Sequence, residues 1–132
     1  MQLTKEQLDK LIKIFEEKGV CLAYLFGSAA KGEMGPLSDY DFAFYAGEKD
    51  SGKIFDLKMK LAGELSRVLE TDRIDVVALN TAENPELKYQ IIKDGNLIYE
   101  QEPFRLLIEP KILSEYFDFH DFLLRHNLTK AL

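Results

Sequence analysis

The sequence predicts one α/β domain, in which strands alternate with amphipathic helices, followed by a helical C-terminal appendage. Its 132 residues suit a single domain with a sizeable core. Apolar runs typical of buried strands alternate with runs of helical spacing, which is the pattern of a layered α/β fold. We therefore expect a main domain over residues 1–101. The aromatic, mostly helical segment 102–132 is expected to pack on that domain or to serve as a partner interface.

The first half of the main domain is expected to hold one helix and two strands. Thr4 and Gln7 form a capping box before a run of apolar residues at helical spacing, and Gly19 provides a left-handed stop. Residues 20–26 are a short apolar run that suits a strand buried on both faces. A Gly-Ser turn and a turn-rich stretch follow, and a second strand is expected over residues 39–45.

The second half repeats the alternation of helix and strand. Apolar residues at helical spacing predict a long amphipathic helix over residues 54–69, and residues 73–79 form the third expected strand. Residues 84–95 predict a short helix, because an asparagine cap precedes a proline at the first helical position and a glycine closes the segment. Residues 96–100 are expected to form a short edge strand.

The C-terminal segment leaves several alternatives open. Pro110 could be the first residue of a second helix or a kink within one. His120 and His126 are off helical register for a shared metal, so packed or solvated helix residues are the simpler interpretation. Core packing and a partner or self-association surface, including a homo-oligomer, are equally compatible with the aromatic residues Tyr116, Phe117, Phe119 and Phe122.

Composition excludes several classes of function. The chain has 17 basic and 23 acidic residues and a net charge of −6. Because nucleic-acid binders gain most of their affinity from Lys and Arg on phosphates, we expect no broad nucleic-acid binding. A single nucleotide held through a metal ion and a basic protein partner remain possible.

Localisation and redox chemistry are also constrained by the sequence. The longest apolar run, residues 20–26, is far shorter than the ~20 residues that span a bilayer. The N-terminal residues lead into a charged pattern rather than a secretory signal. We therefore expect a cytoplasmic protein with no membrane partner. Cys21 is the single cysteine, which excludes an internal disulfide, and it is expected to be inert packing.

Carboxylates at the starts of two strands form a candidate metal site. Asp39 and Asp41 are two positions apart in a strand, so they point to the same face, about 6.6–6.8 Å apart along the chain. Such like charges repel unless a cation joins them, and oxygen ligands suit Mg²⁺ or Mn²⁺. Asp75 is the one charged residue within 74–79, and a neighbouring strand could bring it beside the pair. The alternative is that all three are ordinary turn and strand-entry charges.

A glycine-serine pair strengthens the case for a nucleotide site. Gly27 and Ser28 follow a predicted buried strand, where small residues let backbone N–H groups approach a phosphate and the serine adds a hydroxyl donor. Such a pair alone is most often only a turn. Its conjunction with Asp39 and Asp41 at the start of the next strand is much rarer. A phosphate cradle together with metal carboxylates indicates a nucleotide site.

The stretch GSAAKGEMGPLSDYDFAFY resembles the signature of the DNA polymerase β-type nucleotidyltransferase superfamily, in which Gly-Ser is followed after a short fixed gap by Asp-x-Asp. The small size, Ser38 before Asp39, and the strand RIDVVAL are similar to its minimal nucleotidyltransferase (MNT) branch, over about residues 4–100. This resemblance implies a polymerase β-like fold, with a mixed β-sheet flanked by helices. It also implies transfer of a nucleoside monophosphate from a nucleoside triphosphate, most simply AMP from ATP.

The resemblance further implies roles for individual residues. Two Mg²⁺ ions, with Mn²⁺ possible, would stabilise the attacking and leaving oxygens of an in-line displacement. The implied catalytic and metal-binding residues are Asp39, Asp41 and Asp75. The implied nucleotide-binding residues are Gly27, Ser28, Lys31 and Ser38. Branch members often carry arginine where Lys31 stands, and lysine lacks the bidentate fork, so we expect modest phosphate affinity there but not inactivity.

Many MNT proteins are antitoxins paired with HEPN-type ribonuclease toxins, and some attach AMP to a toxin tyrosine. The resemblance therefore implies a HEPN-type toxin as partner and acceptor. One alternative is a binding module that neutralises its partner by contact, with weak or absent catalysis. A second is a small-molecule nucleotidyltransferase, which the short chain disfavours unless a dimer supplies the acceptor pocket.

Overall fold

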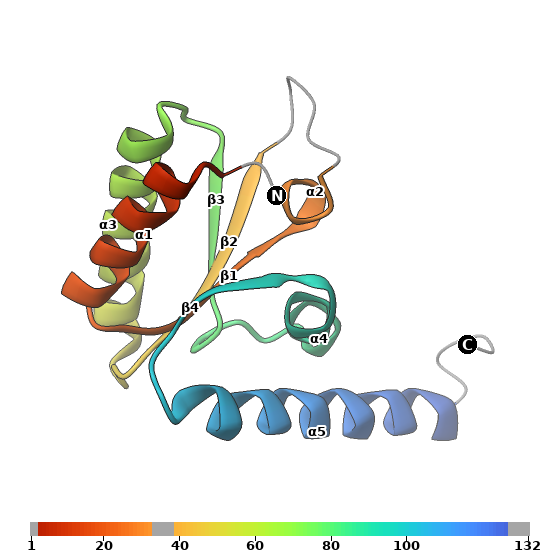
Figure 1. The fold of residues 1–132 in the computed structure, drawn as a ribbon. Coiled ribbons are helices and arrows are strands. Elements are labelled where there is room, and N and C mark those ends of the chain that lie inside the picture. Colours follow the sequence, from red (N-terminus) through yellow and green to blue (C-terminus); the bar gives the residue numbers. More distant parts are fainter. Residues whose placement is uncertain (1–2, 33–38, 127–132) are drawn as a thin grey trace.

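A mixed four-stranded sheet forms the centre of the fold, in a computed structural model that describes residues 3–32 and 39–126 (Figure 1). The strands are β1 (Val20–Phe26), β2 (Tyr40–Ala46), β3 (Ile74–Ala78) and β4 (Asn96–Glu100). Their order across the sheet is β3-β2-β1-β4. β1 runs antiparallel to both β2 and β4, whereas β2 and β3 are parallel. The mixed sheet that the family resemblance implies is confirmed.

Helices cover both faces of this sheet (Figure 1). The helices are α1 (Lys5–Glu17), α2 (Gly27–Ala30), α3 (Ser51–Leu69), α4 (Pro85–Asp94) and α5 (Phe104–Arg125). α1 and α3 lie together on one face, while α4 and α5 lie on the other. α3 is the crossover that joins the parallel strands β2 and β3, a connection that requires a segment of this length.

Each face of the sheet has its own apolar core, because successive strand residues point to opposite sides. Phe42 and Phe44 of β2 belong to the core under α1 and α3, whereas Ala43 between them belongs to the core under α4 and α5. β1 contributes to both cores and is almost entirely buried, with Leu22 and Leu25 at 0% exposure. The expectation of a strand buried on both faces is thus confirmed.

The helix caps that the sequence predicts are present in the structure. Thr4 and Gln7 exchange two hydrogen bonds of 3.0 Å at the start of α1, and Gly19 adopts a φ of 75° after its end. The Asn84 side chain accepts hydrogen bonds from the amides of Glu86 and Leu87 at the start of α4. These contacts fix where each helix begins and ends.

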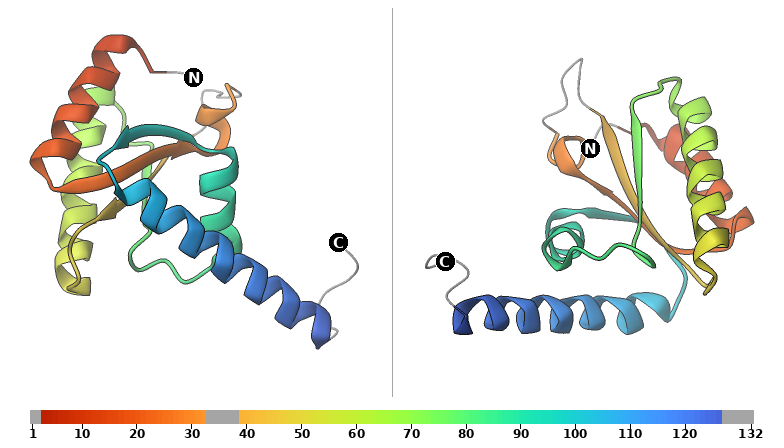
Figure 2. Two further views of the ribbon diagram at one scale, coloured as in Figure 1. Left: turned by 60° about the horizontal axis from the view of Figure 1, so that its bottom comes forward. Right: turned by 180° about the vertical axis from the view of Figure 1, so that it is seen from behind.

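α5 is one continuous helix, and Pro110 lies inside it rather than at the start of a second helix. Proline has no N–H to offer the carbonyl of Leu106, four residues earlier, and Leu106 lies on the exposed side of the helix at 78% exposure. Ile108 and Ile112 are buried against the domain. Beyond them the helix extends past α4, as both views in Figure 2 show.

Polar and aromatic contacts attach α5 to the domain. The buried Tyr24 hydroxyl of β1 donates a 2.7 Å hydrogen bond to the Glu109 carboxylate. The Lys88 ammonium, on α4, lies 2.8 Å from the Glu115 carboxylate. At the next position of each helix, the rings of Tyr89 and Tyr116 stack with centroids 3.9 Å apart. α5 therefore packs on the main domain through its first half.

Among the helices that the structure describes, none is long and apolar enough to cross a membrane.

Candidate active site

Two of the predicted carboxylates meet where β2 and β3 begin. The parallel pairing places Asp41 directly across from Asp75, as the sequence predicts. Asp39 immediately precedes β2 and is exposed to solvent. Tyr40 stacks on Phe42 with ring centroids 6.4 Å apart and packs on the core under α1 and α3. Because side chains alternate along a strand, Asp41 lies on the opposite face, on the side of α4 and α5.

Gly27 adjoins Asp41 so closely that no other residue fits there without movement. Gly27 has a φ of 73°, which favours glycine. A Cβ at this position would overlap Asp41 Oδ2 and lie 3.2 Å from Asp41 Cγ. The end of β1 and the start of β2 are hydrogen-bonded neighbours, with Phe26 paired to Asp41. The glycine of the Gly-Ser pair therefore leaves the space that the Asp41 carboxylate occupies.

The carboxylates repel one another. Burial raises the pKa of the Asp41 carboxyl above its ordinary value, and the negative charges of Asp75 and Asp39 raise it further. A bound cation would remove this repulsion. Within residues 3–32 and 39–126, no group of three or more His, Cys, Asp or Glu side chains is already arranged to hold a metal ion. Repulsion between the carboxylates favours keeping them apart when no cation is bound. Their oxygen atoms are the ligand type that Mg²⁺ prefers.

Three of the four predicted nucleotide-binding residues, Gly27, Ser28 and Lys31, lie on or next to α2. Ser28 is half-buried in its first turn, and Lys31 is exposed just after its end. Ser38 lies outside the described residues. The sequence predicts a turn here, whereas Gly27–Ala30 forms a helical turn. The two alanines, which favour helix, are the signal for it.

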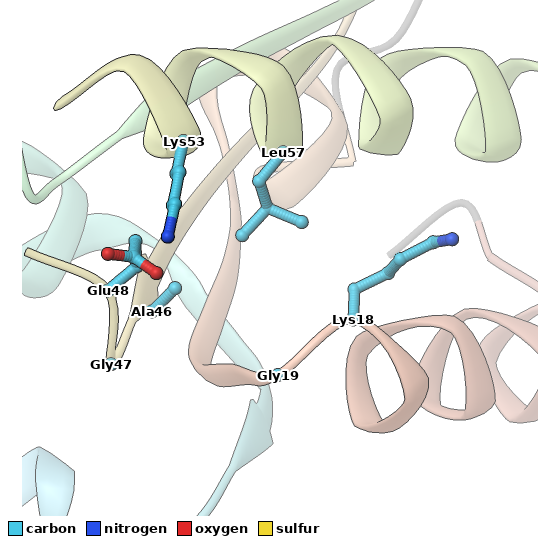
Figure 3. A pocket seen from close by; sticks show the side chains of 7 residues that line it. All are labelled: Lys18, Gly19, Ala46, Gly47, Glu48, Lys53 and Leu57. Carbon is cyan, nitrogen blue, oxygen red and sulfur yellow. The ribbon is translucent and has the colours of Figure 1, made fainter. Parts of the chain in front are cut away.

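A surface hollow of about 410 Å³ lies at the other end of β1 and β2, away from the carboxylates (Figure 3). Two of its three charged side chains already have partners. Lys18 Nζ lies 3.5 Å from the Glu64 carboxylate, and the Glu48 carboxylate accepts two 3.0 Å hydrogen bonds from following backbone amides. The hollow therefore offers no cluster of free charges comparable with the carboxylates of β2 and β3.

The weaker sequence candidates are packing residues. The His120 ring lies 5.8 Å from Tyr116 and the His126 ring 4.4 Å from Phe122, so each histidine packs beside a different aromatic ring of its own helix. Cys21 is 4% exposed, and burial raises the pKa of its thiol. The predicted burial of Cys21 is confirmed.

Known proteins share this architecture. Residues 9–104 match the family described as polymerase beta, nucleotidyltransferase. A solved toxin–antitoxin complex with AMP-PNP contains a chain that is 26% identical, with a TM-score of 0.75, over 89% of this chain and 93% of that one. A mutant of the MntA–HpeT toxin–antitoxin is similar at 24% identity, with the same TM-score and coverage.

A third similar structure is a complex of a tri-AMPylated HEPN toxin with its MNT antitoxin from Shewanella oneidensis. It has 23% identity and a TM-score of 0.71, over 93% of this chain and 94% of that one. No protein with a curated description matches the sequence at a significant level. The family match covers the sheet, the carboxylates and the Gly-Ser pair together. This chain therefore belongs to the polymerase β nucleotidyltransferase family.

Proposed function

We propose that the protein is a Mg²⁺-dependent nucleotidyltransferase that acts as an antitoxin, moving AMP from ATP to a hydroxyl group of a HEPN-type toxin. The observation that carries this proposal is the alignment of Asp41 with Asp75 beside Gly27. Uncompensated like charges on neighbouring strands disfavour the folded state. Their presence beside a glycine that leaves room for one of them favours a role in cation and phosphate binding.

The proposed roles follow from position. Asp39, Asp41 and Asp75 would hold the metal ions, and Gly27 and Ser28 would bind the triphosphate. Bound Mg²⁺ neutralises phosphate charge and stabilises the attacking and leaving oxygens. Lys31 and Ser38 complete the proposed nucleotide-binding residues.

Similarity to known complexes supports the nucleotide and the partner. The 26% identical chain comes from a toxin–antitoxin complex that contains AMP-PNP, an ATP analogue. In the Shewanella oneidensis complex the HEPN toxin is AMPylated. These complexes motivate ATP as the substrate and a HEPN-type protein as the acceptor.

Intact-mass measurement tests the proposal. The purified protein is mixed with Mg²⁺ and each nucleoside triphosphate in turn, with and without the product of the adjacent gene as the candidate partner. We expect the mass of that partner to increase by AMP when ATP is present. The increase should be absent with the Asp39→Asn/Asp41→Asn variant. A partner that forms a complex but gains no mass would contradict the transfer reaction.

Neutralisation by contact is the second candidate function, and the far half of α5 favours it. This half carries exposed apolar side chains, with Phe117 57% and Phe122 50% exposed. We propose this surface as the contact for the HEPN-type partner, since exposed aromatic residues are enriched at protein interfaces. The two functions are compatible, because a docked partner can also be the acceptor.

Substitution of Phe117 is expected to weaken partner binding. Phe117→Ser removes an exposed ring from α5, and we expect the dissociation constant for the HEPN-type partner to rise by about tenfold or more, as for an aromatic hot spot. Phe55→Ser is the matched control, because Phe55 on α3 is 58% exposed and lies on the other side of the sheet. Titration of labelled partner measures both. If the two variants bind the partner equally well, the Phe117 surface of α5 is not part of the interface.

A further inference from the structure

α2 carries the proposed triphosphate-binding turn but is too short to hold its own position. It contains four residues, Gly27–Ala30, whereas isolated helices below about 12–15 residues are marginal in water. Its placement must therefore come from contacts with the rest of the domain. Ala29, at 0% exposure, supplies one such contact by packing into the core under α1 and α3.

The last carbonyls of α2 show where a second contact comes from. The Ser28 carbonyl accepts a 3.2 Å hydrogen bond from the Lys31 amide, and the Ala29 carbonyl accepts a 3.3 Å bond from the Gly32 amide. These bonds are local. The Ala30 carbonyl instead accepts a 3.1 Å hydrogen bond from Asn96 Nδ2, at the start of β4. Because a carbonyl can only accept, the side-chain nitrogen is the atom that faces it.

The turn from α4 into β4 sets the position of Asn96. The Gly95 amide donates a 2.9 Å hydrogen bond to the Ile91 carbonyl, which ends α4. A Cβ on Gly95 would overlap that carbonyl oxygen and lie 3.3 Å from the Leu25 carbonyl of β1. Asn96 is then paired with Leu25, two residues before Gly27. The sheet backbone thus presents the Asn96 side chain to the end of α2.

We propose that Asn96 is a positioning residue for the nucleotide, because its amide holds α2 and thereby the Gly27–Ser28 turn beside Asp41. This inference rests on the proposed nucleotidyl transfer. Asn96 acts on the phosphate-binding turn and does not contact β2 or β3 in the sheet. Its loss is therefore expected to weaken nucleotide binding while leaving the carboxylates in place.

Two substitutions separate the lost donor from an added charge. Asn96→Ala and Asn96→Asp both remove the amide donor, and only the second adds a negative charge. We expect both to raise the KM for ATP by about tenfold, the scale of one hydrogen bond, with less than about a threefold change in kcat. Asn84→Asp is the matched control. Asn84 only accepts hydrogen bonds at the start of α4, and aspartate caps a helix equally well.

Amide hydrogen exchange supplies a readout that does not depend on activity. The amides of Lys31 and Gly32 are expected to exchange about tenfold faster in both Asn96 variants and at the wild-type rate in Asn84→Asp. Unchanged exchange, or a KM that rises only in Asn96→Asp, would overturn the inference. If the wild type is active and both Asn96 variants have its KM for ATP, the positioning role of Asn96 is overturned while the proposed function stands. A wild type that transfers no nucleotide would overturn the proposed function and this inference together.

Discussion

Asp41→Asn is expected to produce a protein that is more stable than the wild type and yet transfers nucleotide at least ~100-fold more slowly. The rate falls because metal-assisted stabilisation of the transition state contributes several kcal/mol, which corresponds to two or more powers of ten. The stability rises because the substitution removes a partly buried charge that faces Asp75. Most inactivating substitutions lower stability, so the combination is diagnostic of an electrostatic cost at the site.

The direction of the Asp41 pKa shift predicts how folding stability changes with pH. The folded-state pKa of Asp41 is raised above its ordinary value of 3.8, so the folded protein binds this proton more tightly than the unfolded chain does. Stability is therefore lost as pH rises from 3.8 through the raised folded value. The advantage of Asp41→Asn should appear over the same interval and persist at neutral pH.

Thermal unfolding without and with Mg²⁺ measures the stability. Mg²⁺ should raise the melting temperature of the wild type more than that of Asp41→Asn, because the ion would bind the folded wild-type site. Asp56→Asn is a control with the same chemical change on an exposed position of α3, and it should alter neither rate nor stability. A variant less stable than the wild type at neutral pH would contradict the electrostatic account.

Gly27→Ala is expected to lower the transfer rate by about 100-fold through the neighbouring carboxylate. The added methyl would overlap Asp41 Oδ2, the end of a movable side chain, so we expect the carboxylate to rotate away rather than the sheet to open. A displacement of about 1 Å in a catalytic group can cost about 10²-fold in rate. The left-handed backbone of Gly27 adds roughly 1–2 kcal/mol of strain to any residue with a side chain.

Gly19→Ala separates strain from displacement. Gly19 has a φ of 75°, nearly that of Gly27, but a Cβ there would meet nothing within 4 Å. Both variants should therefore lose similar stability in thermal unfolding, while Gly19→Ala keeps the wild-type transfer rate. Similar rates in the two glycine variants would show that Gly27 has no steric role at the carboxylates.

Much of the main domain follows from short-range patterns in the sequence. The capping box at Thr4, the left-handed Gly19 and the Asn84 cap are local interactions, so they were predictable and are confirmed. The pairing of Asp75 with Asp41 was predictable, because a single charged residue in an otherwise apolar strand indicates a polar site beside it. The functional roles of these aspartates stay predictions.

Other features depend on contacts that no local pattern encodes. α2 is helical because the sheet and Asn96 support four residues that could not form a helix alone. Asn96 lies 66 positions from its hydrogen-bond partner, and asparagine at the start of a strand reads as an ordinary turn residue. The helix across Pro110 likewise persists because buried neighbours, Ile108 and Ile112, dock it on the domain.

Because α5 extends beyond the domain, the proposed partner-binding surface lies apart from the carboxylates of the proposed transfer site. From Phe117, whose ring still contacts Tyr89 of α4, to Arg125 the helix rises about 12 Å at 1.5 Å per residue. A partner bound there is tethered to the protein. Its acceptor hydroxyl then reaches the carboxylates in an intramolecular step, at an effective concentration of about millimolar. The site then needs little affinity for the acceptor side chain itself. Any hydroxyl that the tethered partner brings within reach becomes a substrate by geometry.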